Sequence, residues 1–318
     1  MGADRDLRPP DALESPRFAG IRTFMRLPHR PAAAGADVVV LGIPFDTGAT
    51  FRVGARFGPV AIRAASVLLK PYSVEQGVDV FAACSAVDLG DVDVVPGYLD
   101  DSYARIREAV AAVVAAGAVP LALGGDHSIT LPELRALAGH WGPLALVQFD
   151  AHTDTWDSYF GRKYTHGTVV RRAVEEGLIL PQRSTQVGIR GPLYRADDVE
   201  EARRLGLEVI PMTTVRRQGA EAVAEAIRRR TADAPAFLSF DVDFLDPAFA
   251  PGTGTPQVGG ATSAEALQIL QGCAGLTMAG ADVVEVVPAY DVGEITALLA
   301  AQVVFEYLAL VGRQRVGG

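Results

Sequence analysis

Short apolar runs recur along the chain, separated by stretches in which apolar residues return with helical spacing. The runs are apolar at nearly every position instead of alternating with polar residues, which is typical of strands that are buried on both faces. We predict eight such strands, at residues 36–42, 85–89, 119–123, 144–149, 185–189, 207–210, 236–240 and 277–284.

Helices are predicted between these strands, and Pro59 stands where the first of them begins, at a position that proline favours. The predicted helices cover residues 59–69, 101–116, 128–138, 167–176, 197–205, 220–230, 263–272 and 293–310. Alternating strands and helices indicate parallel βαβ units with helices on both faces of one sheet, and an eight-stranded barrel would use the same alternation. The fold class is therefore α/β, with sheet and barrel both open at this point.

The N-terminal segment differs from the rest of the chain. Residues 1–35 are rich in proline and arginine and lack a steady period, so we expect an arm that packs on the molecule, with a flexible tail as far as Leu13 as the alternative. Residues 36–312 contain neither a linker-like stretch nor an internal repeat. We therefore expect a single domain over residues 36–318.

Composition narrows the classes of partner. The chain has 318 residues, 49 % of them hydrophobic, and a formal net charge of -9, which argues against a nucleic-acid or anionic-membrane partner. Only two cysteines occur, Cys84 and Cys273, both in apolar or small-residue surroundings. This usage is typical of a reduced protein with buried thiols. We expect a cytoplasmic protein that acts on a small molecule and binds neither nucleic acid nor membrane.

Candidate metal ligands alternate just after the fourth predicted strand. Asp150, His152 and Asp154 are two residues apart, so in an extended chain their side chains project to the same side. Asp241 and Asp243 repeat this spacing after another apolar run. In either architecture these residues belong at the carboxyl ends of parallel strands, where sites of α/β proteins lie.

His127, which follows the third apolar run, completes a set of six oxygen and nitrogen ligands without a thiolate. Such a set suits a hard or borderline divalent ion such as Mn²⁺ or Mg²⁺. Six ligands are too many for one ion that keeps open positions, so we predict two metal ions. A sheet edge with solvated acidic residues is the simpler alternative.

Five motifs in sequence order carry a resemblance to a known family. They are Gly-Gly-Asp-His-Ser at 124–128, Asp-Ala-His-Thr-Asp at 150–154, Ser-Phe-Asp-Val-Asp-Phe-Leu-Asp-Pro at 239–247, Pro-Gly-Thr-Gly-Thr-Pro at 251–256 and Val-Glu-Val-Val-Pro at 284–288. With these motifs the chain resembles the ureohydrolase superfamily of arginase and agmatinase over most of residues 36–310. The resemblance implies a three-layer α/β/α sandwich with an eight-stranded, mostly parallel sheet, instead of the barrel.

The same resemblance implies two Mn²⁺ ions per chain and a distribution of their ligands. One ion would be held by His127, Asp150, Asp154 and Asp241, and the other by Asp150, His152, Asp241 and Asp243. Asp150 and Asp241 would then bridge the two ions. A pair of divalent ions roughly 3.5 to 4 Å apart activates water for attack on a carbon that water alone attacks too slowly.

The activity implied is hydrolysis of a guanidino group to urea and an amine. His166 would supply the proton that the leaving amine needs, Glu285 would hold the guanidinium by paired hydrogen bonds, and the Thr255 hydroxyl would orient Glu285. We count His166, Glu285 and the ligand Asp154 as catalytic. The alternatives are a loop histidine without a catalytic role, a single-metal deacetylase of the same fold, and a metal-binding protein that is not an enzyme.

The loop that follows Asp154 bears on the substrate. Arginases have an asparagine where this chain has Trp156, which favours the agmatinase branch and agmatine or a related linear guanidino compound. Trp156 and Tyr159 would pack on the methylene chain of the substrate. Arg162 and Lys163 would favour the carboxylate of a guanidino acid, 4-guanidinobutyrate or 3-guanidinopropionate, over an ammonium. Both substrate classes stay open, and the resemblance implies a homotrimer or homohexamer with the arm as one contact.

Overall fold

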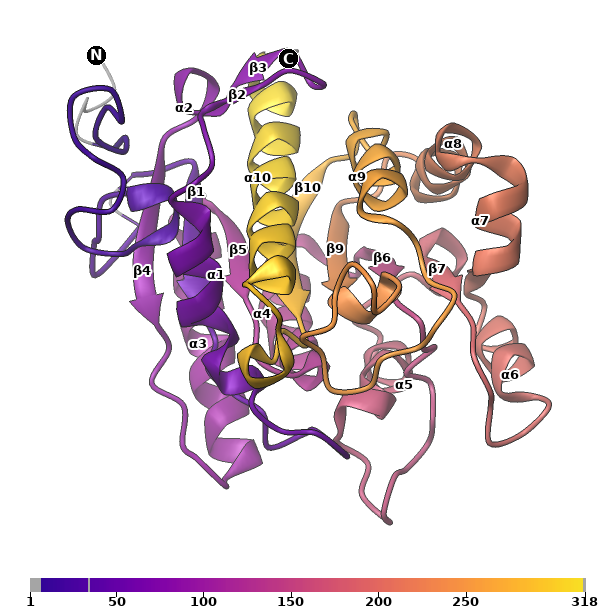
Figure 1. The fold of residues 1–318 in the computed structure, drawn as a ribbon. Coiled ribbons are helices and arrows are strands. Elements are labelled where there is room, and N and C mark those ends of the chain that lie inside the picture. The colour runs from indigo at the N-terminus through magenta and orange to yellow at the C-terminus, as the bar shows by residue number, and fades with distance from the viewer. Residues whose placement is uncertain (1–6, 34, 317–318) are drawn as a thin grey trace.

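The computed structural model describes residues 7–33 and 35–316, which build one eight-stranded sheet between two layers of helices (Figure 1). The strand order is β4-β1-β5-β10-β9-β6-β7-β8, and every pairing is parallel. The strands are β1 (Val38–Gly42), β4 (Ala86–Asp91), β5 (Val119–Leu123), β6 (Ala145–Phe149), β7 (Thr185–Ile189), β8 (Glu208–Pro211), β9 (Ala236–Asp241) and β10 (Met278–Val284). The three-layer sandwich is confirmed and the barrel is excluded.

Two sets of helices cover the two faces of the sheet (Figure 1). The longer elements are α1 (Gly58–Ser66), α3 (Leu99–Ala115), α4 (Thr130–Trp141), α5 (Val169–Glu175), α6 (Asp198–Arg204), α7 (Met212–Gln218), α8 (Ala220–Thr231), α9 (Ser263–Gln271) and α10 (Ile295–Val316). On one face α1 packs on α10, and α9 packs on both α10 and α8; on the other face α4 packs on α3 and α5. Each predicted strand is present with ends within two residues of those expected.

Sequence periodicity missed two short features. One is a hairpin of β2 (Tyr72–Ser73) and β3 (Val78–Asp79) that leads into α2 (Val80–Ala83). The other is α7, which starts directly after β8 and ends at Gly219. Strands of two residues and a seven-residue helix with β-branched residues are too short to establish a period.

Burial differs between the inner strands and the edge strands of the sheet. Every residue of β1, β6, β7, β9 and β10 is buried, whereas the edge strands β4 and β8 are partly exposed. A parallel sheet that is covered by helices on both faces has apolar residues at nearly every position, which accounts for the apolar runs in the sequence.

The last helix, α10, lies across the middle of the front layer in Figure 1. By length and apolar composition alone α10 could cross a bilayer, but 83 % of its most apolar stretch is buried within the protein. It also carries Glu306, which accepts hydrogen bonds from three glutamine side chains. We therefore describe α10 as the central helix of the core.

The N-terminal arm packs on the domain in the part that the structure describes. Phe24 is buried, and its N–H donates to the Asp88 carboxylate at 2.7 Å. Arg63 on α1 donates to both oxygens of the same carboxylate. The expected flexible tail as far as Leu13 lies partly outside the described residues, while Leu7 is buried in a small cluster with β1 and β4 residues.

Candidate active site

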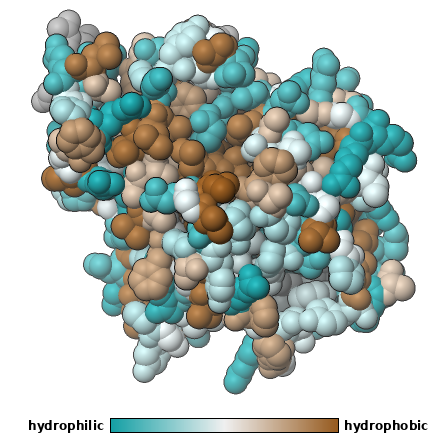
Figure 2. All heavy atoms as spheres, in the orientation of Figure 1, coloured by the Kyte–Doolittle hydropathy of each residue, from teal (hydrophilic) through white to brown (hydrophobic). Residues whose placement is uncertain are grey.

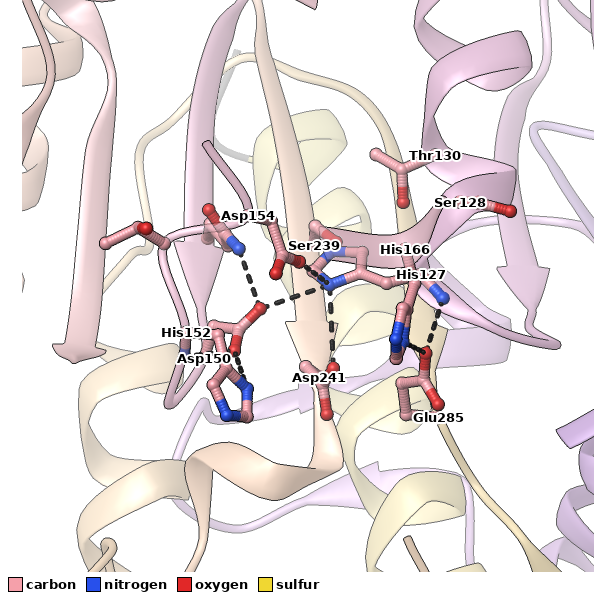
Figure 3. Close-up of polar contacts among 12 residues, drawn as sticks. His127, Ser128, Thr130, Asp150, His152, Asp154, His166, Ser239, Asp241 and Glu285 are labelled. Atoms are coloured by element: carbon pink, nitrogen blue, oxygen red, sulfur yellow. Dashed lines mark hydrogen bonds and ion pairs between the residues drawn. The ribbon is translucent and has the colours of Figure 1, made fainter. Parts of the chain in front are cut away.

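The carboxyl ends of four adjacent strands bring the candidate residues together. The strands β5, β10, β9 and β6 are neighbours in the sheet, and their carboxyl ends meet at one edge. Each contributes a motif residue at or just beyond its end: His127 after β5, Glu285 after β10, Asp241 at the end of β9 and Asp150 after β6. Figure 3 shows these side chains pointing toward one another.

His127 faces three carboxylates. Its Nδ1 lies 2.9 Å from Asp154 Oδ2, 3.1 Å from Asp150 Oδ2 and 3.5 Å from Asp241 Oδ2 (Figure 3). This nitrogen is buried and has no assigned hydrogen-bond partner in the part of the chain that the structure describes. The other ring nitrogen, Nε2, is occupied by the Ser239 hydroxyl at 2.8 Å. Nδ1 is therefore the atom available to a cation.

A second group of ligands lies beside the first. His152 Nδ1 is 3.0 Å from Asp243 Oδ2 and 3.5 Å from Asp150 Oδ1. Asp150 thus presents one oxygen to each histidine, and it belongs to both sets of three side chains whose ligand atoms lie within 4.8 Å of one another. Asp241 turns Oδ2 toward His127 of the first group, while its Oδ1 accepts from the N–H of Asp243 in the second, and its bridging role stays a prediction.

Four carboxylates and two imidazoles without a thiolate fit a pair of hard or borderline divalent ions. The carboxylates are buried, and in the metal-free protein their charges oppose one another. Burial, together with the charges of Asp243 and Asp150, raises the pKa of Asp241 well above its usual range. In the metal-free protein, protons therefore bind at a site whose donor atoms suit metal ions.

Two of the site residues have backbones in the left-handed region. Asp154 has φ of 50° and Glu285 has φ of 64°. Such conformations cost of order 1–3 kcal/mol in residues other than glycine, and they are found where the surroundings enforce them, often at functional sites. Asp154 is fixed by its carbonyl, which accepts from Val170 in α5, and Glu285 by its N–H, which donates to Gly125.

Glu285 keeps one oxygen free. Its Oε1 accepts from the His127 N–H and from His166 Nδ1, each at 2.9 Å. Its Oε2 is buried without an assigned partner, and an added Cβ at Gly254 would lie 3.4 Å from that oxygen. Burial opposes ionisation, but the charge and hydrogen bond of His166 together with the contacts of His127 outweigh it and lower the pKa of Glu285. A charged acceptor thus stands beside the metal ligands.

His166 connects Glu285 to a residue that the sequence did not single out. Its Nε2 lies 2.7 Å from the Thr50 hydroxyl and 3.2 Å from the Thr50 backbone nitrogen. Burial opposes protonation, but the Glu285 carboxylate outweighs it and raises the pKa of His166 to about 9. Thr50 lies in a loop rich in glycine and threonine that shows no motif in the sequence.

The Thr255 hydroxyl has a different partner from the one expected. It approaches Asp243 Oδ2 at 3.4 Å, so in this structure it supports a metal ligand instead of orienting Glu285. The hydrogen bonds that hold Glu285 come from His127 and His166, and the expected contact between Thr255 and Glu285 is not formed in this structure. Thr255 still lines the cavity beside the ligands.

A cavity of about 690 Å³ opens over the ligands, and its lining includes Asp154, Asp241 and His166. The aromatic residues expected there are present: the rings of Trp156 and Tyr159 stack with centroids 5.0 Å apart. Tyr194, which the sequence did not indicate, also lines the cavity, and its hydroxyl lies 2.9 Å from that of Tyr159. An aromatic wall therefore extends outward from the ligands.

The two basic residues of this loop are not where we expected them. Arg162 and Lys163 are exposed, and neither lines the cavity. Tyr159 and Arg162 exchange both backbone hydrogen bonds at 2.9 Å, with Phe160 and Gly161 at positive φ between them. This tight turn reverses the chain after Tyr159, so the prediction that Arg162 and Lys163 read the substrate was wrong. Both cysteines, in contrast, are free and buried as expected.

Comparison with known proteins identifies close relatives. A family model described as "Arginase family" matches residues 36–309. The chain is 50 % identical over 305 residues to a guanidinopropionase of Pseudomonas aeruginosa, with 96 % of each chain covered. It superposes on the proclavaminate amidino hydrolase of Streptomyces clavuligerus with a TM-score of 0.91 and 42 % identity, covering 94 % of this chain and 99 % of the other. It is also similar to a Trypanosoma cruzi formiminoglutamase with Mn²⁺, with a TM-score of 0.79, 25 % identity and coverage of 87 % and 94 %.

The metal-free protein should lose stability as the pH rises from about 5 to 9. Burial and the charge of Asp150 raise the pKa of Asp154 to about 6, and that of His166 is raised to about 9. In both groups the folded pKa exceeds the unfolded one, so the folded protein binds more protons and loses stability as they dissociate. The stability contributed by Asp154 should be lost between about pH 4 and pH 6, and that contributed by His166 between about pH 6.5 and pH 9.

Calorimetric melting of chelator-treated protein across this pH range tests the expectation. Burial raises the pKa of Asp126 to about 7, so this residue should also make the folded protein less stable as the pH rises. A melting temperature that rises steadily between pH 5 and 9 would contradict it.

Proposed function

The chain belongs to the arginase family, and on that premise we propose that it is an amidinohydrolase that converts the guanidino group of a small linear compound to urea and an amine. The observation that carries this proposal is the joint position of two ligand groups, a charged carboxylate with a free oxygen, and a histidine at one cavity. Two of the named relatives, the guanidinopropionase and the proclavaminate amidino hydrolase, act in this class of reaction.

We propose two Mn²⁺ ions per chain, held by His127, Asp150 and Asp154 on one side and by Asp150, His152 and Asp243 on the other, with Asp241 beside the first. When bound, such a pair lowers the pKa of water to about 7 and polarises the group under attack. Manganese is supported by the oxygen-rich donor set and by the metal that the Trypanosoma cruzi relative carries.

The chain's own residues provide binding and proton transfer. Glu285 Oε2 is a buried carboxylate oxygen without a partner, and a guanidinium N–H supplies the charge-assisted hydrogen bond that it lacks. His166 is held between Glu285 and Thr50 at the cavity wall. In its protonated form it is placed to pass a proton to the departing amine. Burial of the cluster keeps bulk water from these groups.

The other readings of the sequence fit less well. A deacetylase with a single metal ion needs one ligand group, whereas Asp150 here serves two. A metal-binding protein without catalytic activity has no use for the free Glu285 oxygen or for a histidine aligned with it. Hydrolysis of a guanidino group uses both.

Urea release tests this function directly. Chelated protein should be inactive and should regain activity with Mn²⁺ more than with Zn²⁺. His166→Ala should keep both metal ions but slow turnover by roughly 10²- to 10⁴-fold, the usual contribution of a general acid. Elemental analysis with a urea assay measures both quantities. Full activity without any metal, or an unchanged rate in the variant, would refute the assignment.

The cavity favours a carboxylate tail on the substrate. Arg52 is the one arginine or lysine in its lining, and no carboxylate of the described residues pairs with it; its guanidinium lies 4.6 Å from the Tyr290 ring centroid. The acidic lining residue away from the ligands, Asp198, already accepts from Arg195. An ammonium tail would therefore lack a free partner, so we propose a guanidino acid over agmatine.

Removing this cation should change substrate preference. Arg52→Gln should lower kcat/KM for 3-guanidinopropionate and 4-guanidinobutyrate by about tenfold or more, the size of one hydrogen bond to a charged group. The rate on agmatine should not fall. Arg162→Ala and Lys163→Ala are matched controls, since both residues lie outside the cavity. Equal losses of kcat/KM on the guanidino acids and on agmatine would show that Arg52 does not bind the carboxylate end of the substrate.

We propose self-association, as a homotrimer or homohexamer, through the face that α1 and the start of α10 form. Hydrophobic residues gather over these elements in Figure 2. The exposed large side chains of this region are Phe57, Val60, Leu68, Val292, Ile295 and Leu298. A cluster of exposed apolar residues on a water-facing surface marks an interface.

Charge placed on this face should dissociate the assembly. Light scattering should give a trimer or hexamer for the natural chain and a smaller mass for Val60→Lys combined with Ile295→Lys. Val258→Lys, at another strongly exposed position, is the matched control. A monomeric natural chain, or an assembly that the double variant leaves intact, would exclude this interface.

A further inference from the structure

Arg190 lies directly after β7 and is the most heavily engaged cation near the site. It donates to carbonyl groups from three separate segments of chain, with distances of 2.6 Å to Asp243 and 2.7 Å to Gln257 as the shortest. The full set of acceptors is the carbonyl oxygens of Gly188, Asp243, Phe244, Leu245, Gln257 and Val258. No ion pair joins Arg190 to a carboxylate within residues 7–33 and 35–316.

The acceptors belong to the segments that carry ligands and line the cavity. The carbonyls of Asp243 to Leu245 follow β9, so the contact fixes the backbone of a metal ligand. The carbonyl of Gln257 belongs to the loop that lines the cavity. The backbone N–H of Arg190 also donates to the carbonyl of Ala151, which lies between two more ligands. One residue thus joins the Asp150 segment, the Asp243 segment and the cavity wall.

The packing around this junction leaves little room for adjustment. A Cβ added at Gly260 would come within 2.5 Å of the Arg190 guanidinium, and one at Gly191 would strike the side chain of Gln257. Burial disfavours the charged form of Arg190 and lowers its pKa, and the carbonyl acceptors oppose that cost. Its planar fork spreads five N–H donors over three nitrogens and so spans separate segments, whereas lysine has three donors on a single nitrogen.

We propose that Arg190 is a positioning residue for the second ligand group, Asp150, His152 and Asp243, and sets its geometry through the main chain. Asp150 and His152 flank the carbonyl that the Arg190 N–H binds, and Asp243 bears a carbonyl that its guanidinium binds. The first group shares Asp150 with the second, but its other two members, His127 and Asp154, receive no hydrogen bond from Arg190. This inference rests on the two-ion centre of the proposed function, but not on its substrate.

Metal titration of the chelated protein tests the inference without an activity assay. The natural chain should bind two Mn²⁺ ions, and Arg190→Lys should weaken one of them by roughly 10- to 100-fold, the range for residues that orient ligands. Arg190→Met should weaken it further. Arg216→Met is the matched control, because Arg216 donates to the carbonyls of Gly259 and Gly260 in the same cavity loop and to none near a ligand.

A second background identifies which ion is affected. With His152→Ala only the first group should bind Mn²⁺ tightly, and adding Arg190→Lys should then weaken that ion less than it weakens the second ion in the natural background, because Arg190 contacts the segment of Asp150 but neither His127 nor Asp154. Two tightly bound ions in Arg190→Lys would overturn the inference, even with a lowered melting temperature. Equal weakening of the first group in the His152→Ala background would also overturn it. A natural chain that binds two ions but releases no urea would refute the proposed function alone.

Discussion

The structure depends on the convergence of four buried carboxylates and two imidazoles at the ends of adjacent parallel strands. Two like charges 4 Å apart repel by about 4 kcal/mol at the effective dielectric of a protein site. In the metal-free chain this repulsion is relieved by protons, as the raised pKa of Asp241 indicates. Divalent ions would relieve it more fully, which is why the site is better explained by metal binding than by fold stability.

Holding such a cluster requires rigid supports, and these come from several layers of the fold. Asp154 and Glu285 are kept at positive φ by hydrogen bonds to α5 and to Gly125. Behind His127, the Ser239 hydroxyl connects Nε2 to the Asp282 carboxylate at 2.7 Å. The Tyr307 hydroxyl of α10 donates to the carbonyl of Asp282. The buried helix therefore supports the site as well as the core.

The cavity adds selectivity to this charged centre. The ligands Asp154 and Asp241 line the cavity and suit a cationic guanidinium, as does Glu285, which lies next to the lining residues His166 and Gly254. The stacked rings of Trp156 and Tyr159 suit methylene groups. Arg52, which also lines the cavity, contributes a positive charge. The guanidino acid that we propose as substrate, with a guanidinium at one end and a carboxylate at the other, would match these lining residues.

The sequence by itself determined the strands and indicated the ligand set, because apolar runs mark buried parallel strands and the ligands follow those runs. The one-sided strand expected for Asp150, His152 and Asp154 is not formed, since β6 ends at Phe149 and Asp154 has a positive φ. The family resemblance then excluded the barrel and indicated Glu285 and His166. Only the tertiary structure decided that Arg52 lines the cavity while Arg162 turns away from it, and that Arg190 joins segments far apart in the chain. Loop side chains take their positions from packing between distant segments, and no local period in a sequence records such contacts.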